Sequence, residues 1–125
     1  MPTAMESGPL LEVEHLCVTF SARKGSFGPR LALKAVDGVS LEVASGDVVG
    51  LVGESGSGKT TTARSILGLQ KPDRGSVLFE GRDIQSLSGP DLRALRKRIQ
   101  LIPQDAIGSL NPRRTVRQTI SEGLQ

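Results

Sequence analysis

The chain is poor in aromatic residues: its 125 residues include three phenylalanines and no tryptophan or tyrosine. Its apolar core must therefore be built from aliphatic side chains. The scarcity also argues against binding of single-stranded nucleic acid, which relies on aromatic side chains that stack on bases within a basic groove. We therefore expect no nucleic-acid partner, although a net charge of +3 makes the chain mildly basic.

Cysteine, histidine and long apolar runs are also scarce. Cys17 is the only cysteine, which excludes a disulfide framework and indicates a reducing compartment. No apolar run approaches the ~18 residues of a membrane span, and the N-terminus has no signal-peptide pattern. The single histidine, His15, is expected to be structural. We predict a soluble, cytosolic chain with a flexible tail over residues 1–10 and one domain over 11–125.

The first part of that domain is expected to be β-structure. Alternating apolar and polar residues predict a half-buried strand over Leu11–Phe20, with His15 on its apolar side. Ser21–Arg30 is a basic loop that contains glycine and proline. Residues 31–43 have the pattern of two strand pieces that are separated by a hairpin-type turn at Asp37-Gly38.

Two short, almost wholly apolar segments predict strands that are buried on both faces, as in a parallel sheet. They are Val48–Gly53 and Ile99–Pro103. Between them, Ser76–Ile84 has the pattern of a strand with a turn at Gly81.

Three helices are predicted from their start signals. The first covers Lys59–Leu69, and proline and glycine in the following KPDRG segment end it. The second covers Ser88–Arg98, where Ser88 and Asp91 have the spacing of a capping box. The third opens at Thr115, with Gln118 at capping-box spacing, and runs toward Gln125.

The segment GESGSGKT carries the strongest functional signal in the chain. It fits the pattern G-x-x-x-x-G-K-[ST] and lies between a predicted buried strand and a predicted helix. Backbone N–H groups in such a loop form a concave nest, and the helix dipole adds positive potential, so a polyphosphate is the natural ligand. Lys59 would bridge the β- and γ-phosphates, and the Thr60 hydroxyl would bind Mg²⁺. The alternative is a purely structural role, in which the glycine-rich turn only caps a helix.

A phosphate loop does not by itself select one class of enzyme. One alternative is a small P-loop kinase or phosphotransferase in which Asp105 holds the metal. Another is a non-enzymatic module in which the basic helix Asp91–Arg98 binds anionic surfaces.

The order of segments resembles the first half of the ATP-binding domain of ABC transporters. The resemblance rests on VDGVSLEV before the phosphate loop and on IPQDAIGSLNPRRTV (Ile102–Val116), which is similar to the Q-loop region of oligopeptide and dipeptide importers. It covers about residues 11–125 and implies an α/β fold: a RecA-like P-loop NTPase core fragment with an antiparallel β subdomain, truncated before the second half of the domain.

The resemblance also implies roles for individual residues. Gln104 would be the Q-loop glutamine, which reaches Mg²⁺ and the attacking water, and Lys59 and Gln104 would be the catalytic residues. Phe20, or alternatively Phe27, would stack on adenine. ATP would bind to Phe20 and to the Walker A loop, which comprises Gly53, Glu54, Ser55, Gly56, Ser57, Gly58, Lys59, Thr60 and the adjoining Thr61.

Members of this family work with membrane permeases and with a second ATP-binding subunit, which implies a peripheral location on the cytoplasmic face of a membrane. Ala106-Ile107 departs from the family pattern next to Gln104. The family's signature sequence and second acidic motif follow the Q-loop, and no counterpart occurs in these 125 residues. We therefore expect ATP binding but no isolated hydrolysis.

Overall fold

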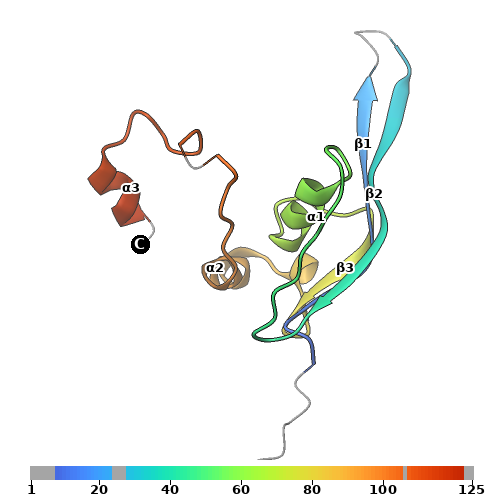
Figure 1. Ribbon diagram of the computed structural model, residues 1–125, viewed down its shortest axis with the longest axis horizontal. Coiled ribbons are helices and arrows are strands. Elements are labelled where there is room, and N and C mark those ends of the chain that lie inside the picture. Colours follow the sequence, from blue (N-terminus) through green and yellow to red (C-terminus); the bar gives the residue numbers. More distant parts are fainter. Residues whose placement is uncertain (1–7, 24–27, 106, 123–125) are drawn as a thin grey trace, which may run out of the picture.

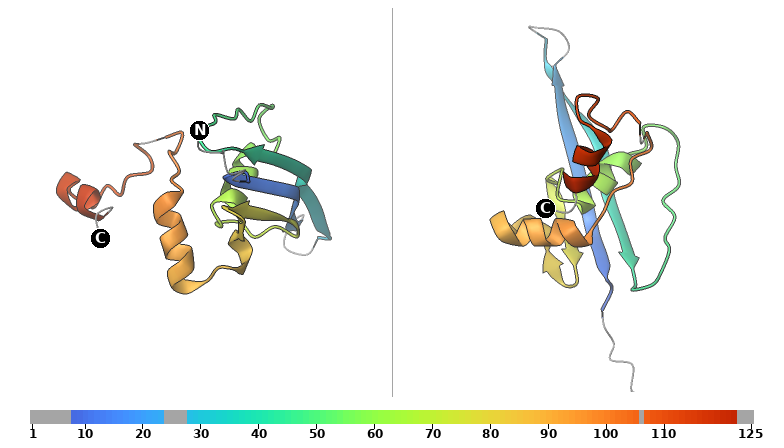
Figure 2. Two further views of the ribbon diagram at one scale, coloured as in Figure 1. Left: turned by 90° about the horizontal axis from the view of Figure 1, so that it is seen from below. Right: turned by 90° about the vertical axis from the view of Figure 1, so that its left-hand side faces the viewer.

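The computed structural model describes residues 8–23, 28–105 and 107–122. Its centre is a four-stranded antiparallel sheet in the order β2-β1-β3-β4 (Figure 1). The strands are β1 (Leu11–Arg23), β2 (Arg30–Val43), β3 (Arg74–Phe79) and β4 (Arg82–Asp83), and the helices are α1 (Lys59–Ile66), the short 3-10 helix η1 (Ile84–Ser86), α2 (Gly89–Arg98) and α3 (Val116–Glu122). In Figure 1 and in the left view of Figure 2, α3 lies apart from the sheet, whereas α1 lies close to it.

β1 contains a bulge that changes which side chains reach the core. Val13 pairs with Leu41 and Leu16 with Val39, so β1 has one residue more than β2 in this interval. His15 lies within it with a φ of 46°, is exposed, and donates its backbone N–H to Ser40 Oγ at 2.9 Å. The prediction that His15 shares the apolar side of the strand is therefore wrong, because the bulge turns Leu16 inward instead.

The predicted turn at Asp37-Gly38 is also wrong, since β2 continues through it. Leu16 pairs with Val39 and Val18 with Val36, so here the extra residue belongs to β2. Gly38 has a φ of 70°, which the bulge accommodates without a reversal of the chain. The Asp-Gly pair thus provides the positive φ of a bulge inside β2, and not of a turn between two strands.

A small core, aliphatic except for Phe79, lies on one face of the sheet. Its fully buried side chains are Leu16, Val13, Val18 and Val77, and it extends to Val36, Phe79, Ile84 and Leu95. Leu10 is half-buried against this core, and residues 1–7 of the predicted tail lie outside the described residues.

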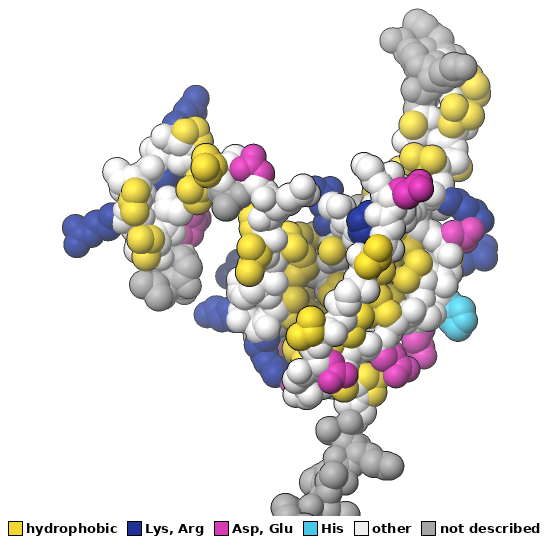
Figure 3. All heavy atoms as spheres, in the orientation of Figure 1, with side chains coloured by type: hydrophobic (Ala, Val, Ile, Leu, Met, Phe, Trp, Pro, Cys, Tyr) yellow, Lys and Arg dark blue, Asp and Glu magenta, His cyan; other side chains and the backbone are white. Residues whose placement is uncertain are grey.

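Neither of the two segments predicted as buried strands forms a strand, and apart from the half-buried Ile99 their apolar side chains are exposed. Val48 is 98% exposed, and Ile102 is also exposed. A strand of a parallel sheet is stable only between hydrogen-bonded neighbours and under covering layers, and within the described residues neither segment pairs with another strand. Figure 3 shows apolar side chains exposed on the face of the molecule that is turned to the viewer.

The helices start where their signals predict. α1 begins at Lys59 and ends at Ile66, three residues before the predicted end, close to Gly68 with its φ of 64°. α2 follows Ser88, whose side chain makes no capping hydrogen bond, so the predicted capping box is wrong in this detail. None of the described helices is long and apolar enough to cross a membrane.

Candidate phosphate-binding site

Residues 53–58 form an exposed loop that leads directly into α1. Gly56 and Gly58 adopt φ values of 82° and 93°, in the left-handed region that favours glycine. Gly58 also lies against the backbone of β2, so a β-carbon there would overlap the carbonyl oxygen of Ala35. The contact of Gly58 with β2 therefore holds the loop against the sheet. It also fixes where α1 begins.

The first turn of α1 presents backbone donors without acceptors. Within the part of the chain that the structure describes, the N–H groups of Gly58, Lys59, Thr60 and Thr61 have no hydrogen-bond partner. Gly58 is the N-cap residue and has no side chain to satisfy them. The next residue, Thr62, donates its N–H to the Gly58 carbonyl at 2.8 Å and so starts the helical pattern. Unpaired N–H groups at a helix N-terminus attract anions.

The Lys59 side chain bends back into this loop. Its ammonium group donates to the carbonyl oxygens of Gly53 and Glu54, both at 2.6 Å, and to Ser57 Oγ at 3.2 Å. A β-carbon on Gly53 would stand 2.5 Å from Ser57 Oγ and 3.9 Å from Lys59 Nζ, so only glycine keeps this interior open. The loop thus holds a cation, with free N–H groups beside it, which fits a polyphosphate.

Two hydroxyl side chains lie on the buried face of α1. Thr62 and Ser65 are only 2% and 3% exposed. Their hydroxyls donate to the carbonyls of Gly58 and Thr61, each at 3.0 Å, which satisfies both groups without partners from other elements. Neither residue was among the predicted site residues. The signal that could have found them is the spacing of Thr62, Ser65 and Ile66 along one helix face.

The remaining predicted site residues are not joined to the loop. Phe20 is 39% exposed and pairs with Leu33 in the β1–β2 hairpin. Phe27 lies outside the described residues. Gln104 is exposed in the segment between α2 and α3, and the structure gives it no hydrogen bond to residues 53–61.

Asp105, the metal ligand of the kinase alternative, is engaged locally. Its Oδ1 accepts the N–H of Gly108 at 2.9 Å, and its carbonyl accepts the N–H of Ser109 at 3.2 Å. These contacts form a tight turn that gives the kinase alternative no support. Of its neighbours, Ala106 lies outside the described residues and Ile107 is exposed.

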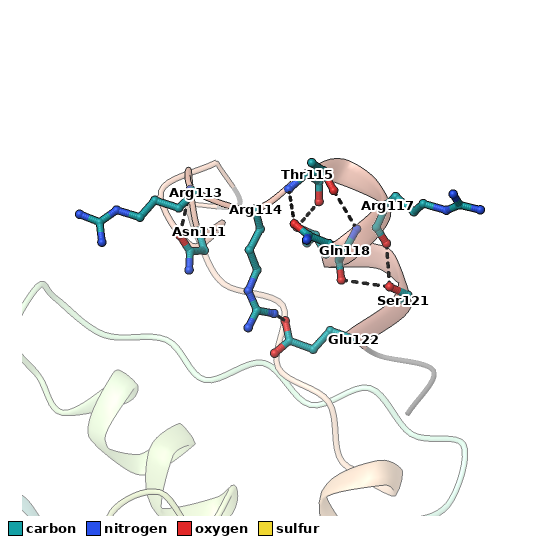
Figure 4. Close-up of polar contacts among 9 residues, drawn as sticks. Asn111, Arg113, Arg114, Thr115, Arg117, Gln118, Ser121 and Glu122 are labelled. Atoms are coloured by element: carbon teal, nitrogen blue, oxygen red, sulfur yellow. Dashed lines mark hydrogen bonds and ion pairs between the residues drawn. The ribbon is translucent and has the colours of Figure 1, made fainter.

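Residues 111–122 form hydrogen bonds and an ion pair with one another (Figure 4). The predicted capping box of α3 is confirmed: Thr115 N–H donates to Gln118 Oε1 at 2.9 Å, and Gln118 N–H donates to Thr115 Oγ1 at 3.3 Å. Arg114 forms an ion pair with Glu122. This part of the chain is therefore organised independently of the phosphate loop.

Comparison with known proteins identifies the family. A family model described as ABC transporter matches residues 36–123, which include the phosphate loop. The chain belongs to the ABC transporter family. This ABC transporter chain is 44% identical over 122 residues to the oligopeptide transport ATP-binding protein AppF of Bacillus subtilis, covering 96% of the chain and 37% of AppF. It is 44% identical over 119 residues to OppF of Salmonella typhimurium, covering 93% of the chain and 36% of OppF.

Solved structures agree with this assignment. One is a dimeric ATP-binding cassette bound to ADP and phosphate, with a TM-score of 0.59 and 25% identity over 70% of the chain and 35% of that structure. Another is a bacterial Atm1-family ABC exporter with ATP bound, with a TM-score of 0.63 and 30% identity over 78% of the chain and 15% of that structure. The predicted fold class, a partial P-loop NTPase with an antiparallel β subdomain, is confirmed. The chain spans little more than a third of the length of the transport proteins it matches.

Proposed function

We propose that the loop of residues 53–60 binds the phosphates of ATP together with Mg²⁺, as part of the ATPase subunit of an ABC importer. The observation that carries this proposal is the row of four backbone N–H groups without acceptors at the start of α1, beside the Lys59 ammonium. Charge-assisted hydrogen bonds from such donors contribute roughly 1.5–3 kcal/mol each, so a few of them support specific nucleotide binding.

In the proposed complex, the N–H groups of Gly58 to Thr61 donate to phosphate oxygens. The Lys59 ammonium exchanges the carbonyls of Gly53 and Glu54 for the β- and γ-phosphates. The Thr60 hydroxyl and the Gln104 amide oxygen would hold Mg²⁺, and Phe20 would stack on the adenine. When bound, Mg²⁺ neutralises charge on the phosphates.

For the whole protein, we propose ATP hydrolysis that drives the import of oligopeptides or dipeptides. The matched relatives AppF and OppF are named for oligopeptide transport, which supports this substrate class. The proposed partners are membrane permeases and a second ATP-binding subunit, on the cytoplasmic face of a membrane. One matched ATP-binding cassette is dimeric, which supports a second ATP-binding subunit as partner.

Calorimetric titration with ATP and Mg²⁺ tests the binding proposal. The variant Lys59→Ala is expected to weaken ATP binding roughly 10- to 100-fold, since it removes a charge-assisted contact of roughly 1.5–3 kcal/mol. The matched control is Lys71→Ala, because Lys71 is exposed and its side chain makes no hydrogen bond to any described residue. Equal affinity of the two variants would contradict the proposal. Thr60→Ala should reduce the gain in affinity that Mg²⁺ gives to ATP.

A further inference from the structure

Phe20 and Leu33 form an apolar pair on the core face of the β1–β2 hairpin. They lie directly opposite one another in the register of the two strands. The extra residue of the nearby bulge, Ala35, belongs to β2, so the side chains of β1 keep their alternation here and Phe20 shares a face with the buried Val18. Unlike Val18, this pair is uncovered: Phe20 is 39% exposed and Leu33 is 63% exposed. The apolar face of the sheet therefore continues beyond the core into solvent.

The next pair along the hairpin is apolar as well. Ala22 lies opposite Leu31, two residues beyond Phe20 and Leu33, and Leu31 is 53% exposed. Figure 1 shows the hairpin extending beyond α1, and Figure 3 shows apolar side chains on its described part. We call these four residues the hairpin platform. An apolar surface that folding leaves in water favours an apolar or aromatic ligand.

The phosphate loop lies on the same face of the sheet and next to the hairpin platform. Ile66 of α1 packs against the core, which places α1 on the core face. A β-carbon on Gly58 would stand 2.2 Å from the carbonyl oxygen of Ala35 and 3.4 Å from Val36 Cγ2. Ala35 precedes the platform by two residues of β2, which span at most about 7 Å. A ligand whose phosphates bind at the loop therefore has the platform as its neighbouring apolar surface.

We propose that Leu33, together with Phe20, forms the surface on which the base of a bound nucleotide lies, and that this surface selects purines by contact area alone. The inference rests on the proposed function, because it takes the phosphates to be at the loop. Contact with the face of a base is tolerant of base identity, since every base has a π-face. The hairpin platform consists of one phenylalanine, one alanine and two leucines, and none of these side chains forms hydrogen bonds with the edge of a base.

Calorimetric titration of the full chain with Mg²⁺ and either ATP or inorganic triphosphate tests the proposal. Leu33→Ser is expected to weaken ATP binding roughly fivefold, because it removes apolar contact area. It should leave the affinity for triphosphate unchanged, since triphosphate has no base. The second variant Leu33→Thr, which keeps a residue that favours strands, should give the same pattern. In the parent chain, GTP should bind within about twofold of ATP, and CTP, with its smaller ring, should bind more weakly.

The matched control is Leu110→Ser, since Leu110 is a leucine of similar exposure, 53%, in the segment between α2 and α3. It should leave both affinities unchanged. Unchanged ATP affinity in Leu33→Ser and Leu33→Thr would overturn the proposal, as would an equal loss for triphosphate, an equal loss in Leu110→Ser, or a preference for ATP over GTP of more than about tenfold. Circular dichroism verifies that each variant is folded.

The parent chain separates this inference from the proposed function. If the parent binds ATP and triphosphate and the Leu33 variants bind both as the parent does, the proposed function stands and the inference fails. If the parent binds neither ligand, the proposed function fails and the inference fails with it.

Discussion

Gly58 meets the carbonyl oxygen of Ala35 at the point where the phosphate loop becomes α1. The contact leaves no room for a β-carbon, and the φ of Gly58 is 93°. Glycine is therefore required here for two independent reasons, one that concerns the backbone conformation and one that concerns the approach to β2. The sheet sets the loop conformation through this contact.

Replacement of Gly58 by alanine is predicted to be more harmful than replacement of Gly56. At Gly56 the φ is 82°, but nothing lies within 4 Å of the position that a β-carbon would occupy, so Gly56→Ala should cost only the ~1–2 kcal/mol of a left-handed residue. Gly58→Ala should cost more, because it adds the overlap with Ala35. Urea unfolding followed by circular dichroism measures both, and equal losses would contradict the contact.

The N-caps of α2 and α3 are predicted to respond differently to alanine. Thr115 takes part in a reciprocal pair of hydrogen bonds with Gln118, whereas the Ser88 side chain caps nothing. Thr115→Ala should therefore destabilise α3 by about 1 kcal/mol, and Ser88→Ala should have little effect on α2. Amide hydrogen exchange within each helix gives the two values. A loss in α2 that equals the loss in α3 would show that Ser88 does cap its helix in solution.

Glu12 is predicted to destabilise the fold at neutral pH. Burial raises its pKa above the ordinary value of 4.5, and the nearby carboxylates of Glu14 and Glu42 add to the shift. Because the folded chain holds this proton more tightly than the unfolded chain, stability falls as the pH rises above 4.5. Glu12→Gln should accordingly raise the unfolding temperature at pH 7 and lose this advantage below pH 4.5.

The control for this prediction is Asp47→Asn, since Asp47 is an exposed carboxylate whose side chain makes no hydrogen bond or ion pair within the described part of the chain. Its unfolding temperature should match that of the parent chain at both pH values. If Glu12→Gln were less stable than the parent at pH 7, the carboxylate cluster would not be repulsive.

Features that depend on short stretches of sequence were predictable. The start of α1 follows from the loop GESGSGKT, and the capping box of α3 follows from the spacing of Thr115 and Gln118. The turn at Gly81 likewise follows from a single glycine between two strand segments. In each case the residues that decide the structure lie within one turn of the element that they form.

Features that depend on distant partners were not predictable. Val48–Gly53 has the composition of a buried strand, but a strand also needs neighbours, and the described residues provide none. The bulges at His15 and Gly38 depend on how β1 and β2 align over their whole length. Similarly, the ion pair between Arg98 and Glu80 joins residues that are 18 positions apart. No local sequence pattern predicts this contact.

An NMR titration of the ¹⁵N-labelled chain tests the central claim most directly. The amide signals of Gly58, Lys59, Thr60 and Thr61 are observed while ATP with Mg²⁺, inorganic triphosphate or adenosine is added. Because these N–H groups have no acceptor among the described residues, we predict that ATP and triphosphate shift their signals and that adenosine alone leaves them in place. Unchanged signals with ATP, or equal shifts with adenosine, would contradict a phosphate site at this loop.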